Sequence, residues 1–434
     1  MARQLVKGIA GLGALVLMSA CMKGLPQEMT PRSHSAQVTR APAPQSFAQA
    51  NGSQIIESLQ FRQSVLAEGS SFDTVAQAVL AANARPAEAD LRAARLRAEA
   101  ASKNWLPKIG PSISLTSLSS VAAQLLVQQV VFDNGKAKAE RAFAAADVEA
   151  VAVTLSTTTN DRVLEALTLY LRAEQAREAA HVSDQARKRM VYFHSIMGER
   201  VNGGVSDISD LRVLANKLAE AENRVIADQE DAQVALAELD AMAARSLADL
   251  RGLPDLDAAP TGIKPLSVLH AEAVRGRDIA QATIDRANLL PGATLNGAIG
   301  DGGDVSLDVS GQQLVGLGTG ASLEAIQAAK DAADRRVAQA SEDTNRKLRR
   351  LSQQLTSLQR QEDQAKTLAE AARQNQILFQ QQFEAGARPI MDVISNYETA
   401  MRLERDYVRV KYDRFRVRLE IASVFGALVD GADI

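Results

Sequence analysis

Two long stretches without proline or glycine constrain this chain more than any other feature of its sequence. Residues 136–197 and 321–385 contain neither residue type, and both stretches are rich in Ala, Leu, Glu, Gln, Arg and Lys, which favour helices. Two shorter stretches of the same kind cover 205–251 and 390–425. The stretch from 321 to 385 would form a helix about 98 Å long at 1.5 Å per residue. Helices of this length indicate coiled-coil packing rather than ordinary globular domains.

The spacing of apolar residues also indicates coiled coils. In the stretch 205–251, Leu211, Leu214, Leu218, Ala221 and Val225 follow one another in steps of three and four, as in a coiled-coil seam. Aromatic residues make up only 4% of the chain. Because much of the apolar content is Ala, we expect closely packed helices rather than a core of large aromatic side chains.

Composition excludes several classes of function. The formal net charge of −3 gives no basic footprint for nucleic-acid binding, so we expect no nucleic-acid partner. A single Cys rules out an internal disulfide, and the four His have no metal-ligand spacing from one another. No Ser–His–Asp, Cys–His or paired-carboxylate arrangement is apparent. We therefore predict no catalytic residue, no cofactor and no metal site.

Landmarks recur along the chain at nearly one offset. The Leu-Pro at 106–107 recurs at 290–291, and the segment 204–211 matches 386–393. Gly135 and Gly320 open the two long helical stretches. This pattern predicts a tandem duplication, in which each copy contains a helix, a strand pair, a long helix, a sharp turn and a helix.

The predicted strands lie between each Leu-Pro and the glycine that follows it. Val305, Leu307 and Val309 alternate with polar residues, which is the period of a strand with one apolar face. Each strand has room for roughly the 9–11 residues that a membrane-crossing strand needs. Four strands cannot close a barrel of useful bore, and open strand edges are not tolerated in lipid. If these strands enter a membrane, several chains must contribute them, and three chains would give twelve.

The N-terminus reads as an export signal. Residues 1–20 form a predicted signal peptide, with Arg3 and Lys7 ahead of an apolar stretch that is too short to span a bilayer. Cys21, after Met18-Ser19-Ala20, resembles the lipobox cysteine of bacterial lipoproteins, and the alternative is an ordinary cleavable signal with an incidental cysteine. Residues 21–70 are then a lipidated N-terminus and a flexible tether.

Taken together, in their order along the chain, these motifs resemble the TolC-type outer membrane efflux protein family over roughly residues 70–428. The segment from Ser71 to Pro86 resembles the family's opening helix, and Trp105-Leu106-Pro107 resembles its entry into the first strand. Residues 131–135 resemble its strand-to-helix junction. The two Gly-x-x-x-Ile-x-Asp turns are similar to its periplasmic coiled-coil tips.

The resemblance implies a mainly α chain with a small β part, built from duplicated long coiled-coil helices and four strands. Three chains would form a 12-stranded β-barrel that continues into an α-helical periplasmic tunnel. The first repeat would cover 71–254, with strands at about 109–133 and a coiled-coil tip at about 200–210. The second would cover 255–434, with strands at about 292–319 and a tip at about 383–392.

The implied function is that of a passive exit duct in the outer membrane of a Gram-negative bacterium, extending into the periplasm. Its partners would be outer membrane lipid, a periplasmic adaptor (membrane fusion) protein and a proton-driven or ATP-driven inner-membrane pump, in efflux or type I secretion. The alternative is a periplasmic coiled-coil adaptor or structural lipoprotein that forms no channel. The paired strand segments favour the duct, because an adaptor would carry a compact β-domain instead.

The resemblance also implies residues that gate the periplasmic aperture, namely Arg388, Asp392, Asp210 and Phe383. In a trimer the charged residues would form rings that select ions and hold a constriction closed. The alternative is that they are ordinary helix-end residues. A carboxylate in a first turn is favoured by the helix dipole, and Arg388 and Asp392 are four apart, as in an exposed ion pair.

The two turns are the adaptor-docking tips by the same resemblance. Their residues are Gly204, Val205, Ser206, Ile208, Gly386, Ala387 and Ile390. The alternative is a plain helical hairpin turn, in which Ser206 caps the second helix and Pro389 occupies a first helical position.

Overall fold

The computed structural model describes residues 53–82, 86–117, 120–257, 262–300, 304–310 and 318–433. The predicted signal peptide and Cys21 lie outside the described residues. The helices are α1 (Gln54–Gln60), α2 (Ser71–Ala82), α3 (Pro86–Ser102), α4 (Lys136–Asn202), α5 (Ile208–Met242), α6 (Leu266–Asn288), α7 (Thr319–Glu384) and α8 (Ile390–Val424), and Gly431–Asp433 form a 3₁₀ turn. The strands are β1 (Lys108–Ser117), β2 (Ser120–Phe132), β3 (Gly292–Gly300) and β4 (Val305–Ser310). The prediction of a mainly helical chain with four strands is confirmed.

Two halves of the chain repeat the same order of elements. Each contains a helix, two strands, a long helix and a shorter helix, in the order α3-β1-β2-α4-α5 and then α6-β3-β4-α7-α8. The long helices α4 and α7 have 67 and 66 residues, and α5 and α8 have 35 residues each. Helix α7 begins at Thr319, one residue before the glycine that the sequence suggested as its start.

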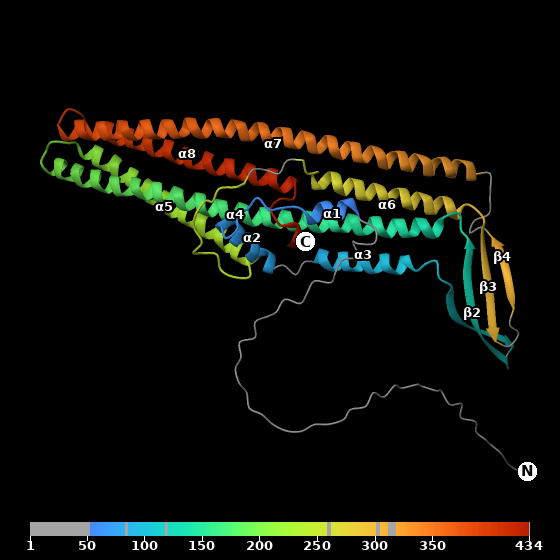
Figure 1. Cartoon of the computed structure of the whole chain (residues 1–434). Helices are drawn as coiled ribbons and strands as arrows, with labels where there is room; N and C mark the ends of the chain where they lie inside the picture. Colours follow the sequence, from blue (N-terminus) through green and yellow to red (C-terminus); the bar gives the residue numbers. More distant parts are fainter. Residues whose placement is uncertain are drawn as a thin grey trace, which may run out of the picture. The chain divides into compact units, whose positions relative to one another are not determined.

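The helices pack side by side in two rows. Helix α4 packs against α5 and α8, and α7 packs against α8, which gives the row α5-α4-α8-α7 (Figure 1). Closer to the sheet, α4 packs against α3 and α6, and α6 packs against α7. Helices α5 and α3 therefore form one margin of the rows, and α7 forms the other. Within the residues described, no helix combines the length and the apolar character needed to cross a membrane.

The main apolar core lies along α4 and α8 and includes α2. Phe72 of α2 makes edge-to-face contacts with the rings of Tyr170 and Phe415. The Tyr170 hydroxyl donates a hydrogen bond to the carbonyl of Gly252 at 2.7 Å. On α5, Leu214 and Val225 are buried, and the other residues of the predicted seam pack against this core. Three of the few aromatic rings therefore meet where α2, α4 and α8 pack together.

Helix α5 ends earlier than the stretch without proline and glycine predicts. The stretch runs to residue 251, but α5 ends at Met242. The Asp240 carboxylate accepts hydrogen bonds from the Leu247 amide at 2.7 Å and from the Ser246 hydroxyl at 2.8 Å. The Ala244 amide donates to the carbonyl of Ala78 on α2. Side-chain and tertiary hydrogen bonds replace the helical ones here, so α5 is shorter than the stretch without proline and glycine.

A buried arginine ties the chain's C-terminal segment to two other parts of the fold. Arg62 is 3% exposed, and its guanidinium donates to the carbonyl of Phe425 and, at 2.8 Å, to that of Lys264. Burial lowers the pKa of Arg62 to about 10. Gly426, next in the chain, has φ +64°, and a Cβ there would lie 2.7 Å from Arg62. Arg62 therefore joins the end of α8 to the segment between the two halves.

Candidate functional site

The four strands form one antiparallel sheet, and most of the exposed apolar side chains of β3 and β4 lie on one of its faces. Val305, Leu307 and Val309 of β4 are 73%, 61% and 70% exposed. The register places them beside Gly297, Leu295 and Ala293 of β3. Those residues pair in turn with Val127, Gln129 and Phe132 of β2, so this apolar face extends across three strands. An exposed apolar patch of this extent is typical of a surface that binds another protein or a membrane.

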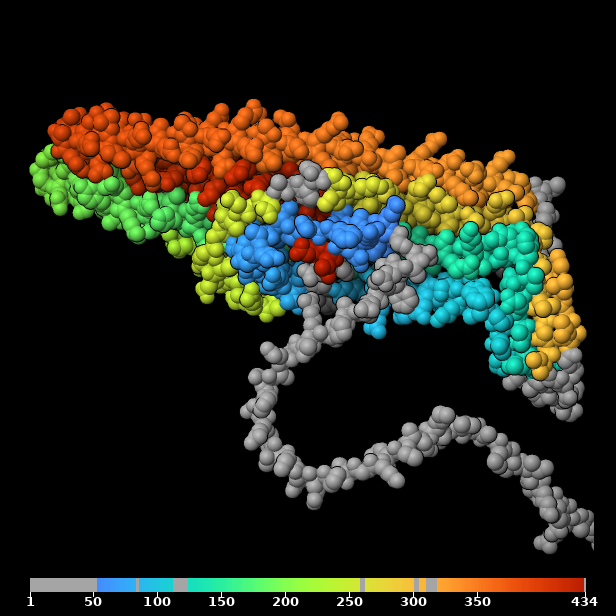
Figure 2. Space-filling model, viewed as in Figure 1, coloured from blue at the N-terminus to red at the C-terminus, as the bar shows by residue number. Residues whose placement is uncertain are grey.

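The opposite face of β3 and β4 is polar. Asn296 donates a hydrogen bond to the Asp308 carboxylate at 2.5 Å, and Ser306 pairs with Asn296 in the register. Strand β2 is less regular, because Leu126 and Val130 are also exposed on this second face. The strand order β1-β2-β3-β4 leaves β1 and β4 as open edges of the sheet. The strands lie beyond the first turns of α4 and α7 (Figures 1 and 2).

The far ends of the two long helices have the same backbone geometry. Gly204 has φ +73° and Gly386 has φ +75°, and each follows the last residues of its helix in the left-handed conformation. The amides of Val205 and Ala387 each donate at 2.8 Å to the carbonyl five residues earlier. The two glycine amides donate to Val201 and Phe383. Both turns are Schellman motifs, which reverse the chain without leaving the helix-end carbonyls unpaired.

Side-chain hydrogen bonds close both turns in related ways. In the first turn, Nε of Arg200 donates to the Ser206 hydroxyl at 3.1 Å. In the second, Nε of Arg388 donates to Oε1 of Gln382 at 2.8 Å. The donor and acceptor have exchanged places between the two copies, while the six-residue spacing is kept. Each turn is therefore held as a compact hairpin by a link across its own base.

Arg388 has three contacts within the second turn. Its guanidinium lies 3.9 Å from the centre of the Phe379 ring, in a cation–π arrangement. Its Nη1 lies 3.6 Å from Oδ2 of Asp392, so the predicted pair is present, although that distance is longer than a hydrogen bond. With Gln382 on its third side, the arginine is held in place before any partner binds.

The other predicted aperture residues lie apart from Arg388. Phe383 packs against the main core, and Asp210 lies half-buried in the first turn of α5. Within the described residues, no hydrogen bond, ion pair or ring contact joins either of them to Arg388. The aromatic partner of Arg388 is Phe379, one turn before Phe383, which the sequence reasoning missed.

The helix caps at the turns also differ from the prediction. Asp207, not Ser206, caps α5, because its carboxylate accepts a hydrogen bond from the Ser209 amide at 2.7 Å. That hydrogen bond lowers the pKa of Asp207. Pro389 occupies the cap position before α8 rather than the first helical position. Val205 and Ile208 are exposed, Gly204, Gly386 and Ala387 are exposed as well, Ser206 is half-buried and Ile390 is buried.

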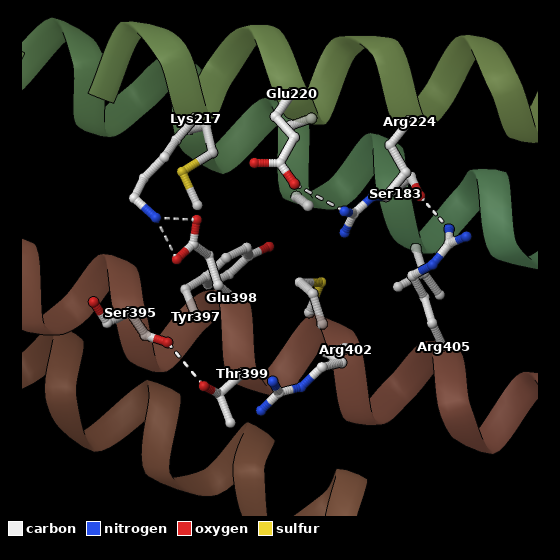
Figure 3. A pocket seen from close by; sticks show the side chains of 15 residues that line it. Ser183, Lys217, Glu220, Arg224, Ser395, Tyr397, Glu398, Thr399, Arg402 and Arg405 are labelled. Carbon is white, nitrogen blue, oxygen red and sulfur yellow. Dashed lines mark hydrogen bonds and ion pairs between the residues drawn. The ribbon is translucent and has the colours of Figure 1, made fainter. Parts of the chain in front are cut away.

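Further along the helices from the two turns, a groove with a volume of about 600 Å³ separates α8 from α4 and α5 (Figure 3). Nζ of Lys217 on α5 lies 2.6 Å from both carboxylate oxygens of Glu398 on α8, across the groove. At the groove's end, Arg405 of α8 pairs with Asp228 of α5, and the Ser183 hydroxyl of α4 donates to the same carboxylate at 2.6 Å. These polar contacts join the second half of the chain to the first.

A third contact of this kind lies beyond the groove. Lys411 of α8 pairs with Glu178 of α4 at 2.8 Å, and the Tyr412 hydroxyl donates to the same carboxylate at 2.9 Å. Burial and the neighbouring Glu178 raise the pKa of Tyr412. Among the described residues, no cluster of three or more His, Cys, Asp or Glu could hold a metal ion.

Solved structures share this arrangement of long helical hairpins and a small sheet. A membrane protein of Pseudomonas aeruginosa is 17% identical with a TM-score of 0.71, and the match covers 93% of this chain and 98% of that one. For the outer-membrane channel OprN the values are 16%, 0.72, 86% and 96%. For the open state of the MtrE outer membrane channel of Neisseria gonorrhoeae they are 14%, 0.67, 86% and 96%.

The chain has the fold of outer membrane channels. No protein-family model matches the sequence, and no curated protein matches it. At these identities the likeness is one of fold, and it agrees with the predicted long helices and small four-stranded sheet. In an outer membrane channel fold, the exposed apolar face of the sheet and the paired helical turns lie at opposite ends of α4 and α7.

Proposed function

We propose that this protein is an outer-membrane exit duct of an efflux system, formed by three copies of the chain. The observation that carries this proposal is the sheet, which is apolar on one exposed face and has two open edges. Three sheets of four strands would close a 12-stranded barrel and remove those edges, with the apolar face toward lipid. A structural lipoprotein confined to the periplasm would expose the same apolar face to water at a large cost.

The helical part supports the same assembly. The rows of helices in one chain end at α5 and α3 on one margin and at α7 on the other. Leu368 and Leu378 of α7, and Val213 and Ile226 of α5, are exposed apolar side chains on these margins. In a ring of three chains, α7 of one copy would lie against α5 and α3 of the next. Helices of 67 and 66 residues, about 100 Å long, would then enclose a tunnel across the periplasm.

The turns at Gly204 and Gly386 would face the periplasmic partners. Six such hairpins in a trimer would present a rim to an adaptor protein and, through it, to an inner-membrane pump. Val205 and Ile208 are exposed apolar residues at this rim and would be buried by an adaptor. Efflux is the function favoured here, and type I secretion would use the same duct with a different pump.

The trimer is tested by measuring the mass of the full-length chain purified in detergent. Three times the chain mass is expected, with the detergent contribution subtracted by light scattering. A chain that stays monomeric and soluble without detergent after removal of residues 1–21 would overturn the duct in favour of the periplasmic lipoprotein.

At the aperture, we expect the Asp392→Ala variant to raise single-channel conductance and lower cation preference. The loss of three carboxylates from a constriction weakens both its closure and its selection of cations. The free energy of unfolding should change by less than about 1 kcal/mol, because the pair with Arg388 is exposed. Asp406→Ala is the matched control, since Asp406 is an exposed partner of Arg409 further along α8. Equal conductance and selectivity in both variants would leave Arg388 and Asp392 as helix-end residues.

We also propose that Cys21 carries a lipid anchor. Lipidation of that cysteine would explain the single Cys directly after a predicted signal peptide. Metabolic labelling with a radioactive fatty acid should mark the wild-type chain, and Cys21→Ser should abolish the label. An unlabelled wild-type chain in the same cells would contradict lipidation without affecting the proposal of the duct.

A further inference from the structure

A second groove lies between α4, α7 and α8, and its charge is unlike that of the groove in Figure 3. It has a volume of about 510 Å³ and shares Tyr397 and Met401 with that groove. Three of the residues that line it are cations, Lys188 and Arg189 of α4 and Arg373 of α7. Its remaining lining is neutral, so none of the nine lining residues is a carboxylate.

The cations of this groove are only partly neutralised by carboxylates outside it. Lys188 pairs with Asp184, one turn earlier on α4, at 2.8 Å. Arg373 pairs with Glu404 of α8 at 3.4 Å, a long distance for such a pair. Within the described residues Arg189 has no carboxylate partner. Its guanidinium instead lies 5.6 Å from the centre of the Tyr192 ring and 5.9 Å from that of Phe193.

Tyr397 lines the groove together with these cations. Its hydroxyl donates a hydrogen bond to the carbonyl of Gln185 at 3.1 Å. Burial raises the pKa of Tyr397, the positive charges of Arg189 and Arg373 lower it, and the Glu404 carboxylate raises it. Two guanidinium groups and one carboxylate, from α4, α7 and α8, therefore act on one hydroxyl that lines the groove.

Apolar surface borders this charge. Ile377 of α7 is 53% exposed and Tyr192 of α4 is 44% exposed, and both line the groove. An aromatic ring can stack against tyrosine, while a carboxylate or sulfonate accepts paired hydrogen bonds from a guanidinium. The groove's volume is within the range of small-molecule sites, about 300–1,000 Å³.

From this combination we infer that the α4–α7–α8 groove binds a small organic anion with a flat apolar body, such as an aromatic carboxylate. Arg189 and Arg373 hold the acidic group, and Tyr192 and Ile377 contact the apolar body. The site goes beyond the function of an open duct, since a passive channel needs no binding site in its wall. Every residue that the site uses comes from α4, α7 and α8 of one chain.

The test is equilibrium binding of 2-naphthoate to the full-length protein in detergent, with protein-free micelles subtracted. Two further probes separate the contributions, the neutral 2-naphthamide and inorganic sulfate. Saturable binding of one naphthoate per chain is expected, with at least about ten-fold weaker binding of the amide and of sulfate. Equal binding of naphthoate and naphthamide, or no saturable binding of naphthoate, would overturn the inference.

Variants locate the site. Arg189→Met should weaken naphthoate binding by about ten-fold or more and leave naphthamide binding unchanged. Gln376→Glu places a carboxylate in the groove with almost no change in side-chain size, and it should weaken naphthoate binding to the same extent. This variant tests the site if Arg189→Met does not fold. Arg402→Met is the matched control, because Arg402 is an arginine of α8 that lines the groove of Figure 3 instead. Loss of binding in the Arg402 variant, or full binding in both of the others, would contradict this location.

Discussion

Replacing Leu307 by arginine is expected to remove the protein from the outer membrane and abolish its channel activity. Leu307 is the middle one of the three exposed apolar residues of β4, and it pairs with Leu295 of β3. An arginine on the lipid face of a barrel costs up to about 2–4 kcal/mol near the bilayer midplane. A trimer would carry three such residues, so the cost multiplies. The measurement is the amount of trimer in the outer membrane fraction, followed by conductance of whatever protein inserts.

The neighbouring residue provides the control for this substitution. Ser306 is exposed on the opposite, polar face of the same strand, where it pairs with Asn296. Ser306→Arg should insert normally and change only conductance or ion selectivity, because that face would line the water-filled lumen. If both arginine variants inserted equally well, the apolar face would not contact lipid.

The largest loss of stability is expected from Asp228→Ala. Only 10% of the Asp228 side chain is exposed, and its carboxylate accepts from Arg405 at 2.8 Å and from Ser183 at 2.6 Å. Removing it leaves a partly buried guanidinium without a counter-charge, which costs about 3–5 kcal/mol. The change is measured as the shift of the thermal unfolding midpoint of the detergent-solubilised protein, which should fall by several degrees.

Two further variants separate the ion pair from a general weakening of α5. Asp231, also on α5, is 63% exposed and lies 3.6 Å from Arg172, so Asp231→Ala should cost less than about 1 kcal/mol. The double variant Asp228→Leu, Arg405→Met should recover most of the loss, because it leaves no unpaired charge. A double variant as unstable as Asp228→Ala would contradict this explanation.

The sequence predicted the features that depend on local pattern. Helices α4 and α7 follow from long stretches without proline and glycine, and β4 follows from the alternation of Val305, Leu307 and Val309. The turns at Gly204 and Gly386 follow from a repeated motif whose glycines have positive φ. Each of these features depends on residues that are neighbours in the sequence.

Contacts between distant residues were beyond that reasoning. Asp228 and Arg405 lie on different halves of the chain, and no spacing within either helix indicates that they meet. Phe379 was missed because the resemblance of the sequence indicated Phe383, whereas the stacking depends on how the turn orients Arg388. The end of α5 was not apparent from the sequence, because Asp240 accepts hydrogen bonds from residues after the helix, and helix propensity does not take such contacts into account.

The groove between α4, α7 and α8 was missed for a related reason. Its cations come from residues 188–189 and 373, and the two segments carry many charges of both signs. Only the packing of the helices separates the carboxylates from the groove and leaves the cations facing it. A single sequence gives the list of charges but not the side on which each one lies.

The central claim is that three copies of this chain form a continuous water-filled passage. Its most direct measurement is the current across a planar lipid bilayer after addition of the full-length protein purified in detergent. We expect discrete conductance steps of one main size, with ion selectivity that shifts in the Asp392→Ala variant. A purified trimer that inserts into the bilayer and passes no current, in the wild type and in Asp392→Ala alike, would contradict the account.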